Sequence, residues 1–163
     1  MAHTQPSLLD DELADFVRGA VSITLASCQG SRVPHLARGT GCRVAADRRQ
    51  LTVLLAASAG ADVLADVRNN RRVAVVFSLL QTHRTLQLKG SDASVVPLDP
   101  GGPALAATYV DAFADGLQAL GYSGAVIRSV LRADAADLVG IRFTPASGSL
   151  QTPGPEAGQA LRA

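Results

Sequence analysis

Residues 21–35 read VSITLASCQGSRVPH. From 21 to 26, the apolar Val, Ile and Leu alternate with Ser, Thr and Ala, which is the period of two of a half-buried β-strand. Gln, Gly and Ser at 29–31 predict a turn, and a second extended segment follows from 33 to about 44. Because two strands joined by so short a turn run antiparallel, this stretch predicts a β-hairpin.

Beyond this hairpin, short apolar or alternating runs predict four more strands, at 51–57, at 73–80, at 85–90 with an extension through 95–98, and at 138–144. Apolar residues at helical spacing predict helices at 9–20, 60–68, 105–120 and 123–131. Consecutive antiparallel strands with helices set apart from them favour an α+β or mainly β fold. We therefore expect a six-stranded antiparallel barrel with flanking helices, since closure removes exposed sheet edges.

Small polar residues and glycine mark the expected ends of these helices. Ser7 can cap the first helix, with the acidic residues 10–12 in its first turn. Asn69 and Asn70 tolerate a left-handed backbone and are expected to end the second helix. Gly121 is expected to stop the long third helix.

The composition bounds the class of protein. With 47% hydrophobic and 18% charged residues, the chain can form one domain over 1–163, with 1–7 and 146–163 as extended tails. The 15 Lys and Arg nearly balance 14 Asp and Glu, and the arginines are interleaved with aspartates, which argues against a nucleic-acid partner. The two cysteines, Cys28 and Cys42, predict neither a disulfide framework nor a metal site.

The chain also lacks the patterns of a membrane or secreted protein. Residues 1–15 show no basic region followed by an apolar one, as a secretory signal requires. The apolar runs at 51–61 and 73–80 are much shorter than the roughly 20 residues that cross a bilayer. We therefore expect a cytoplasmic protein with no membrane partner.

Three stretches, in their order and spacing, resemble the FMN-binding split β-barrel of the pyridoxamine 5′-phosphate oxidase-like proteins. These are the hairpin at 21–35, VRNNRRVAVVF at 67–77 and RTLQLKG at 84–90, and the strand expected at 138–144 also fits. The resemblance implies a six-stranded split barrel that forms a homodimer, with FMN in a groove between the two subunits. It implies an oxidoreductase acting on a small molecule, in which the cofactor supplies the chemistry and the protein supplies position and electrostatics.

The resemblance also implies a set of cofactor-binding residues. Arg38 and Arg43 on the second strand and Ser58 before the short helix are expected at the phosphate, which arginine suits through its planar fork. Thr85 and Gln87 are expected to offer hydrogen bonds to the flavin ring. Each of the five also has a simpler interpretation, as a solvent-facing polar residue or a solvated charge.

The backbone of the second strand decides which arginines can act together. Positions 38 and 43 differ by five, so a regular strand sends their side chains to opposite faces. A bulge at Gly39 or Gly41 would shift the register by one and return both to a common face. A regular strand therefore predicts that Arg38 alone contacts the phosphate, and a bulged strand predicts that both arginines do.

One residue departs from the family's pattern. The family often places Lys or Arg at the start of the short helix after the third strand, where this chain has Asp62. A carboxylate repels a phosphate there, although a helix N-terminus attracts it. The alternatives therefore stay open: an FMN-dependent oxidoreductase, or a non-enzymatic split-barrel binding protein or dimer that has lost flavin or uses heme or deazaflavin. No side chain is identified as a catalytic acid or base.

Overall fold

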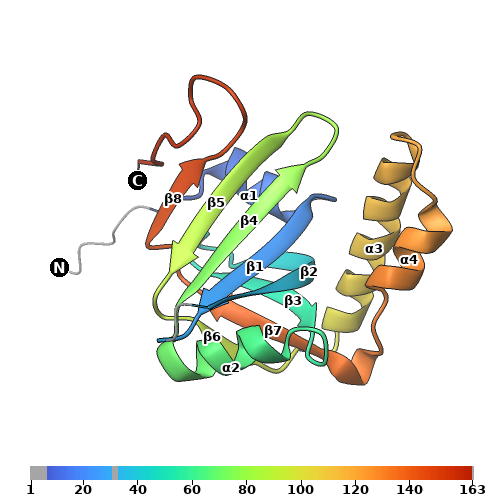
Figure 1. Cartoon of the computed structure of the whole chain (residues 1–163), viewed down its shortest axis with the longest axis horizontal. Helices are drawn as coiled ribbons and strands as arrows, with labels where there is room; N and C mark the ends of the chain where they lie inside the picture. The colour runs from blue at the N-terminus through green and yellow to red at the C-terminus, as the bar shows by residue number, and fades with distance from the viewer. Residues whose placement is uncertain (1–6, 31–32, 163) are drawn as a thin grey trace.

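The computed structural model describes residues 7–30 and 33–162 (Figure 1). These residues form one antiparallel sheet of eight strands in the order β6-β7-β3-β2-β1-β4-β5-β8. The strands are β1 (Ser22–Cys28), β2 (Pro34–Val44), β3 (Leu51–Ala56), β4 (Val73–Leu79), β5 (Arg84–Gly90), β6 (Ser94–Val96), β7 (Leu138–Phe143) and β8 (Ser147–Leu150).

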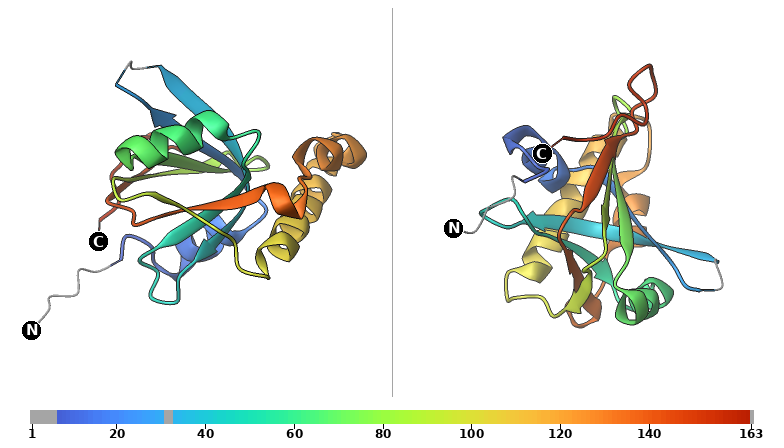
Figure 2. Two further views of the ribbon diagram at one scale, coloured as in Figure 1. Left: turned by 90° about the horizontal axis from the view of Figure 1, so that it is seen from below. Right: turned by 90° about the vertical axis from the view of Figure 1, so that its left-hand side faces the viewer.

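The long strand β2 belongs to both halves of this sheet. Its first part pairs with β1, and the sheet continues from β1 through β4 and β5 to β8. Its last part pairs with β3, and the sheet continues through β7 to β6. The two halves cross at an angle in Figure 2, and their inward side chains meet in one hydrophobic core. The α+β class expected from the sequence is confirmed.

The prediction of six strands was too low for the described residues. Residues 94–96 do not extend β5 but form β6, which pairs with β7. Strand β5 ends at Gly90, where a Cβ atom would lie 2.6 Å from Cδ2 of Phe143. Residues 147–150, expected in an extended tail, form β8 along the edge of β5, and an antiparallel sheet gains stability when such an edge is covered. The chain then folds back, with the Leu161 N–H donating to the Gly148 carbonyl at 2.9 Å.

Four α-helices surround the sheet within the described residues. They are α1 (Asp11–Arg18), α2 (Ala61–Asn70), α3 (Gly102–Gln118) and α4 (Gly124–Leu131), and a 3-10 turn, η1 (Ala135–Asp137), precedes β7. Helix α2 covers one end of the barrel, whereas α3 and α4 form a hairpin at its side (Figure 1). None of the described helices is both long enough and apolar enough to cross a membrane.

One predicted helix end was wrong, one was right in position but not in the residue that turns left-handed, and one is confirmed. The first helix is capped by Asp10, whose Oδ1 accepts from the Leu13 N–H at 2.8 Å, while the Ser7 hydroxyl donates to the Arg48 carbonyl at 2.6 Å. Helix α2 ends at Asn70, as expected, but the residue in the left-handed conformation is Arg71, with φ 60°, and the Asn70 amide donates to the Cys28 carbonyl at 2.8 Å.

Gly121 follows α3 with φ 88°, as expected for a residue that stops a helix.

The core is mostly aliphatic and is supplied by inward residues of both sheet halves. Ile23, Leu25 and Phe77 are fully buried, and β7 adds Phe143. Burying one such side chain stabilises the fold by about 1.5–3 kcal/mol. Helix α3 is tied to this core by Tyr109, whose hydroxyl donates to the Val21 carbonyl at 2.6 Å.

Candidate functional site

One face of the sheet has no helix lying across it among the described elements. It is the outer face of β2, β1, β4, β5 and β8, which Figure 1 shows from the front. Burial alternates along these strands, so every second residue points outward. The outward residues, here called the platform, are small or polar apart from Leu36: Ser22, Thr24, Ala26, Leu36, Arg38, Ala74, Val76, Ser78, Thr85, Gln87, Lys89, Ser147 and Ser149.

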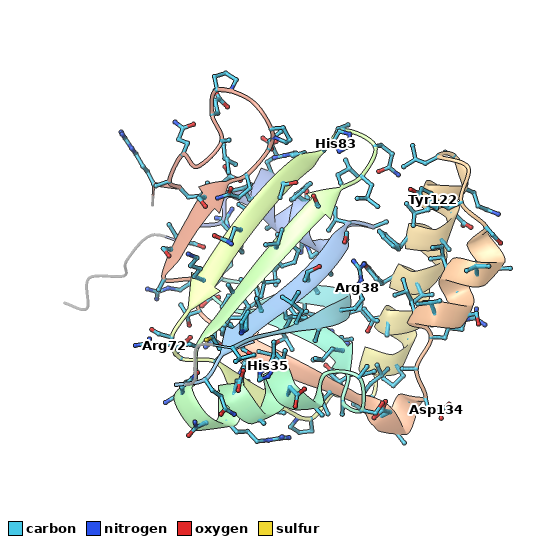
Figure 3. All side chains as sticks on the ribbon, in the orientation of Figure 1. His35, Arg38, Arg72, His83, Tyr122 and Asp134 are labelled. Atoms are coloured by element: carbon cyan, nitrogen blue, oxygen red, sulfur yellow. The ribbon has the colours of Figure 1, made fainter. Side chains whose placement is uncertain are left out.

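The strand register places Arg38 and Gln87 in the same row of the platform. Arg38 pairs with Thr24, Thr24 with Val76, and Val76 with Gln87. In Figure 3, Arg38 lies between β1 and the hairpin of α3 and α4. The row therefore begins at the guanidinium of Arg38 beside α3 and α4, crosses Thr24 and Val76, and ends at the side-chain amide of Gln87.

No carboxylate in the part of the chain that the structure describes neutralises Arg38. Its Nη1 donates to the Ser22 hydroxyl at 2.5 Å, and it makes no ion pair with any residue that the structure describes. Arginine carries its charge at all ordinary pH values, and an unpaired guanidinium keeps donors free for an anion. The serine fixes the side chain without removing its charge.

Thr85 lies in the neighbouring row, opposite Ser78, and these two hydroxyls are hydrogen-bonded to each other. The Thr85 hydroxyl also donates to the His83 carbonyl at 3.0 Å. Gln87 is half-buried, and its amide has no hydrogen-bond partner among the described residues. Three of the five predicted site residues, Arg38, Thr85 and Gln87, are therefore brought together on the platform.

Arg43 and Ser58 lie away from the platform, in contacts that hold the fold together. Arg43 forms an ion pair with Asp99, whose other oxygen accepts from the Gly101 N–H at 2.9 Å at the start of α3. The hydrogen bond from Arg43 lowers the pKa of Asp99. Ser58 donates from its hydroxyl to Asp137 at 2.5 Å and from its N–H at 3.0 Å, which fixes the chain before α2.

The bulge expected in β2 is confirmed. The register shifts between Gly39 and Cys42, and Gly41 has φ 135°, a conformation that side chains rarely adopt. Gly39 and Cys42 consequently both face the interior, and their neighbours Arg38 and Arg43 both face outward.

The bulge does not, however, bring the two arginines to one ligand. Helix α3 packs over β2 between them, so that Thr40 is buried and a Cβ on Gly41 would lie 3.7 Å from Tyr109 of that helix. The expectation that a bulged strand lets both arginines contact one phosphate therefore finds no support in this arrangement.

A buried polar cluster lies where the sequence analysis identified no site. Asp66 of α2 is fully buried, and its Oδ2 accepts from the Ser27 hydroxyl at 2.7 Å and contacts Nδ1 of His35 at 2.8 Å. Its Oδ1 has no partner among the described residues. A sequence signal was present, because a carboxylate at 66 lies on the same helical face as Val63 and Val67.

In this cluster, the charges of Asp66 and His35 stabilise each other. Burial by itself raises the pKa of Asp66, but the hydrogen bonds from Ser27 and His35 outweigh it, and the pKa is lowered. The hydrogen bond to Asp66 raises the pKa of His35 above its ordinary value, burial opposes this, and the charges of Asp66 and Asp62 add to it. The cluster therefore favours a protonated His35 beside an ionised Asp66, and it ties α2 to β1 and β2.

Comparisons with models of known protein families and with curated proteins found no match. Solved structures do match: an F420 reductase is 19% identical, with 86% of this chain and 98% of that chain covered and a TM-score of 0.56. HupZ from Group A Streptococcus is 14% identical, with 92% and 99% covered and a TM-score of 0.54. A putative pyridoxamine 5′-phosphate oxidase from Lactobacillus delbrueckii is 13% identical, with 86% and 92% covered and a TM-score of 0.53.

At these identities the likeness shows the fold. The chain has the split-barrel fold of these structures, over nearly their whole length. The resemblance to the pyridoxamine 5′-phosphate oxidase-like split barrels is thereby confirmed as a resemblance of fold. Function has to be argued from the site, because one fold carries many activities.

Proposed function

We propose that the chain binds an FMN-type flavin on the platform and acts, as a homodimer, as an oxidoreductase on a small molecule. The observation that carries the proposal is the unpaired guanidinium of Arg38 at one end of a row of small side chains that ends at the unpartnered amide of Gln87. A phosphate at Arg38 would gain charge-assisted hydrogen bonds, which are the strong ones.

The spacing of the row suits such a ligand. Arg38 and Gln87 are three strands apart, which is about 14 Å. Thr24 and Val76 lie between them and leave a flat floor for a ring. Gln87 can both donate and accept hydrogen bonds at the polar edge of a flavin, and the Thr85 hydroxyl lies in the next row. When bound, the flavin would supply the electron transfer, and these residues would hold and orient it.

The exposed large hydrophobic side chains support a second copy as the partner. They form two patches, one on the β1–β2 hairpin with Val33 and Leu36, which is 67% exposed, and one on the helical hairpin. The helical patch consists of Leu120, Tyr122, Val126 and Val130. The β1–β2 hairpin projects beyond the sheet on the platform side (Figure 2). A twofold axis through the platform would lay the hairpin patch of one copy on the helical patch of the other and enclose a flat ligand between them.

The experiment compares two ligands that differ only in the phosphate. The purified protein is titrated with FMN and with riboflavin, and its absorbance spectrum as isolated is recorded. We expect Arg38→Ala to weaken FMN binding at least tenfold, about 1.4 kcal/mol, and to leave riboflavin binding unchanged. Arg142→Ala, at an exposed arginine on the other half of the sheet, is the matched control. Equal loss for both ligands, or no loss, would contradict the role of Arg38.

A non-enzymatic binding protein on the same fold is the second candidate. The described platform residues include no carboxylate and no imidazole, the side chains most often used for acid–base chemistry. Titrations with F420 and heme separate the alternatives. A colourless protein whose melting temperature ignores all of these ligands would favour a structural dimer.

A further inference from the structure

A groove of about 760 Å³ lies at the end of the platform opposite the loop that carries His83. It is formed by the end of β1, the start of β4, the end of β5 and the segment at 146–147. Its size is that of a site for a small organic molecule. Its lining includes Ser27, Cys28, Arg72, Lys89 and Ser147.

The charges in this groove are unbalanced. Arg72 and Lys89 both line it, and among its described lining residues there is neither Asp nor Glu. Lys89 pairs with Ala74, so Arg72 lies diagonally across the strand pair from it, about 7–8 Å away. That spacing is between backbone positions; both side chains line the same groove, where their like charges repel, and neither makes an ion pair with a described residue.

Several other arginines of the described surface are paired with a carboxylate. Arg43, Arg84 and Arg128 each contact a carboxylate. Two cations on one wall of a groove repel each other, and no carboxylate among the described residues pairs with either of them to offset that cost. A bound anion would remove the repulsion.

The groove also offers hydroxyl groups for such an anion. Ser91 and Ser147 line it beside the two cations. Ser27 lines it as well, but its hydroxyl is held by Asp66, so it forms a fixed wall. The buried Asp66 lies behind that wall, where His35 balances its charge.

We infer that this groove, at one end of the platform, is a second binding site for a small organic dianion held by Lys89 and Arg72, distinct from the row of Arg38 and Gln87 proposed for the flavin. The apolar part of the ligand would lie against Ala26, Ala74 and Ala146. The site does not depend on the proposed flavin, because Arg38 occupies a different row and is not part of its lining.

Phenyl phosphate is the probe, because it joins a dianion to an apolar ring. It is titrated by calorimetry at low ionic strength into the full chain, alongside phenol as the uncharged reference. We expect binding of phenyl phosphate without detectable binding of phenol. Lys89→Gln and Arg72→Gln should each weaken it roughly tenfold, the effect of one charge-assisted hydrogen bond. Arg68→Gln, outside the groove, is the matched control, and melting curves check folding.

Cys28 provides an independent readout. It is exposed in the groove, whereas Cys42 is buried, so a thiol reagent reports on Cys28 alone. Phenyl phosphate should slow this reaction in the wild type and not in Lys89→Gln. No protection together with no binding at millimolar concentration would overturn the inference.

Titrations with FMN and riboflavin test whether the groove and the flavin site are two different sites. If Lys89→Gln weakens FMN but not riboflavin, the groove holds the cofactor's own phosphate, and the inference of a separate site fails. If Arg38→Ala leaves phenyl phosphate binding unchanged, the inference of a separate site is supported even where the flavin proposal fails.

Discussion

The two ends of β2 carry one outward arginine each, in very different surroundings. Arg43 is closed in by Asp99 and the first residues of α3, so its charge holds a helix in place. Arg38 donates to the hydroxyl of Ser22 and pairs with no carboxylate among the described residues. Both arginines point outward from the same strand, so the difference between them comes from the elements that pack against each end of β2. An outward arginine indicates a ligand only where the fold has not already supplied an anion.

The largest expected effect comes from breaking the bulge that turns both arginines outward. Gly41→Val would place a β-branched residue at φ 135°, which we expect to lower the free energy of unfolding by about 3 kcal/mol. Urea unfolding measures it. The control is Gly30→Ala, where a Cβ would meet nothing within 4 Å. Equal stabilities of the two variants would mean that the bulge is not needed.

A smaller effect is expected at the Arg43 end. Asp99→Ala removes the acceptor of both Arg43 and the Gly101 N–H, so the start of α3 loses an anchor and the unfolding midpoint should fall, by less than in Gly41→Val. FMN and riboflavin affinities should not change. A change confined to FMN would show that Arg43 serves the ligand after all.

The buried cluster at the edge of α2 offers a pH-dependent test. The raised pKa of His35 means that its contribution to stability is complete below about 6.5 and is lost as pH rises through the raised value. The lowered pKa of Asp66 means that its contribution is present above the ordinary aspartate range and is lost as pH falls through the lowered value. Stability from the pair should therefore peak between these limits.

The His35→Asn variant isolates the upper limit. An Asn amide can still donate to Asp66 but does not titrate, so the fall in stability as the pH rises above about 6.5 should be absent in the variant. Urea midpoints measured across that range provide the comparison. A fall of equal size in both proteins would assign the pH dependence to other groups.

Much of the fold could be predicted from the sequence, because its strands and helices follow strong periodicities. Apolar residues alternate with polar or small ones along the strand 21–26 and recur at helical spacing around 105–120, and most of these apolar positions are buried. The strand β8 could not be predicted, since Ser147–Leu150 has no marked pattern and is extended by pairing with β5. The outward direction of Arg38 and Arg43 followed from Gly39 and Gly41 once a bulge was considered. The different partners of the two arginines could not be predicted in this way, because Asp99 is 56 residues away from Arg43 in the sequence.

The smallest expected effect concerns Asp62, which the family pattern places at the phosphate. In the structure Asp62 is exposed in the first turn of α2, which covers one end of the barrel, and Arg38 lies on the platform. If the phosphate binds at Arg38, Asp62→Lys should leave the FMN affinity within about twofold of the wild type, because charges exposed to water are screened over roughly 10 Å. If the phosphate binds at the start of α2, the same change should tighten FMN at least tenfold and leave riboflavin unaffected. Calorimetry with both ligands, together with Arg38→Ala, decides between the two positions, since only one of these variants can alter the preference for FMN over riboflavin.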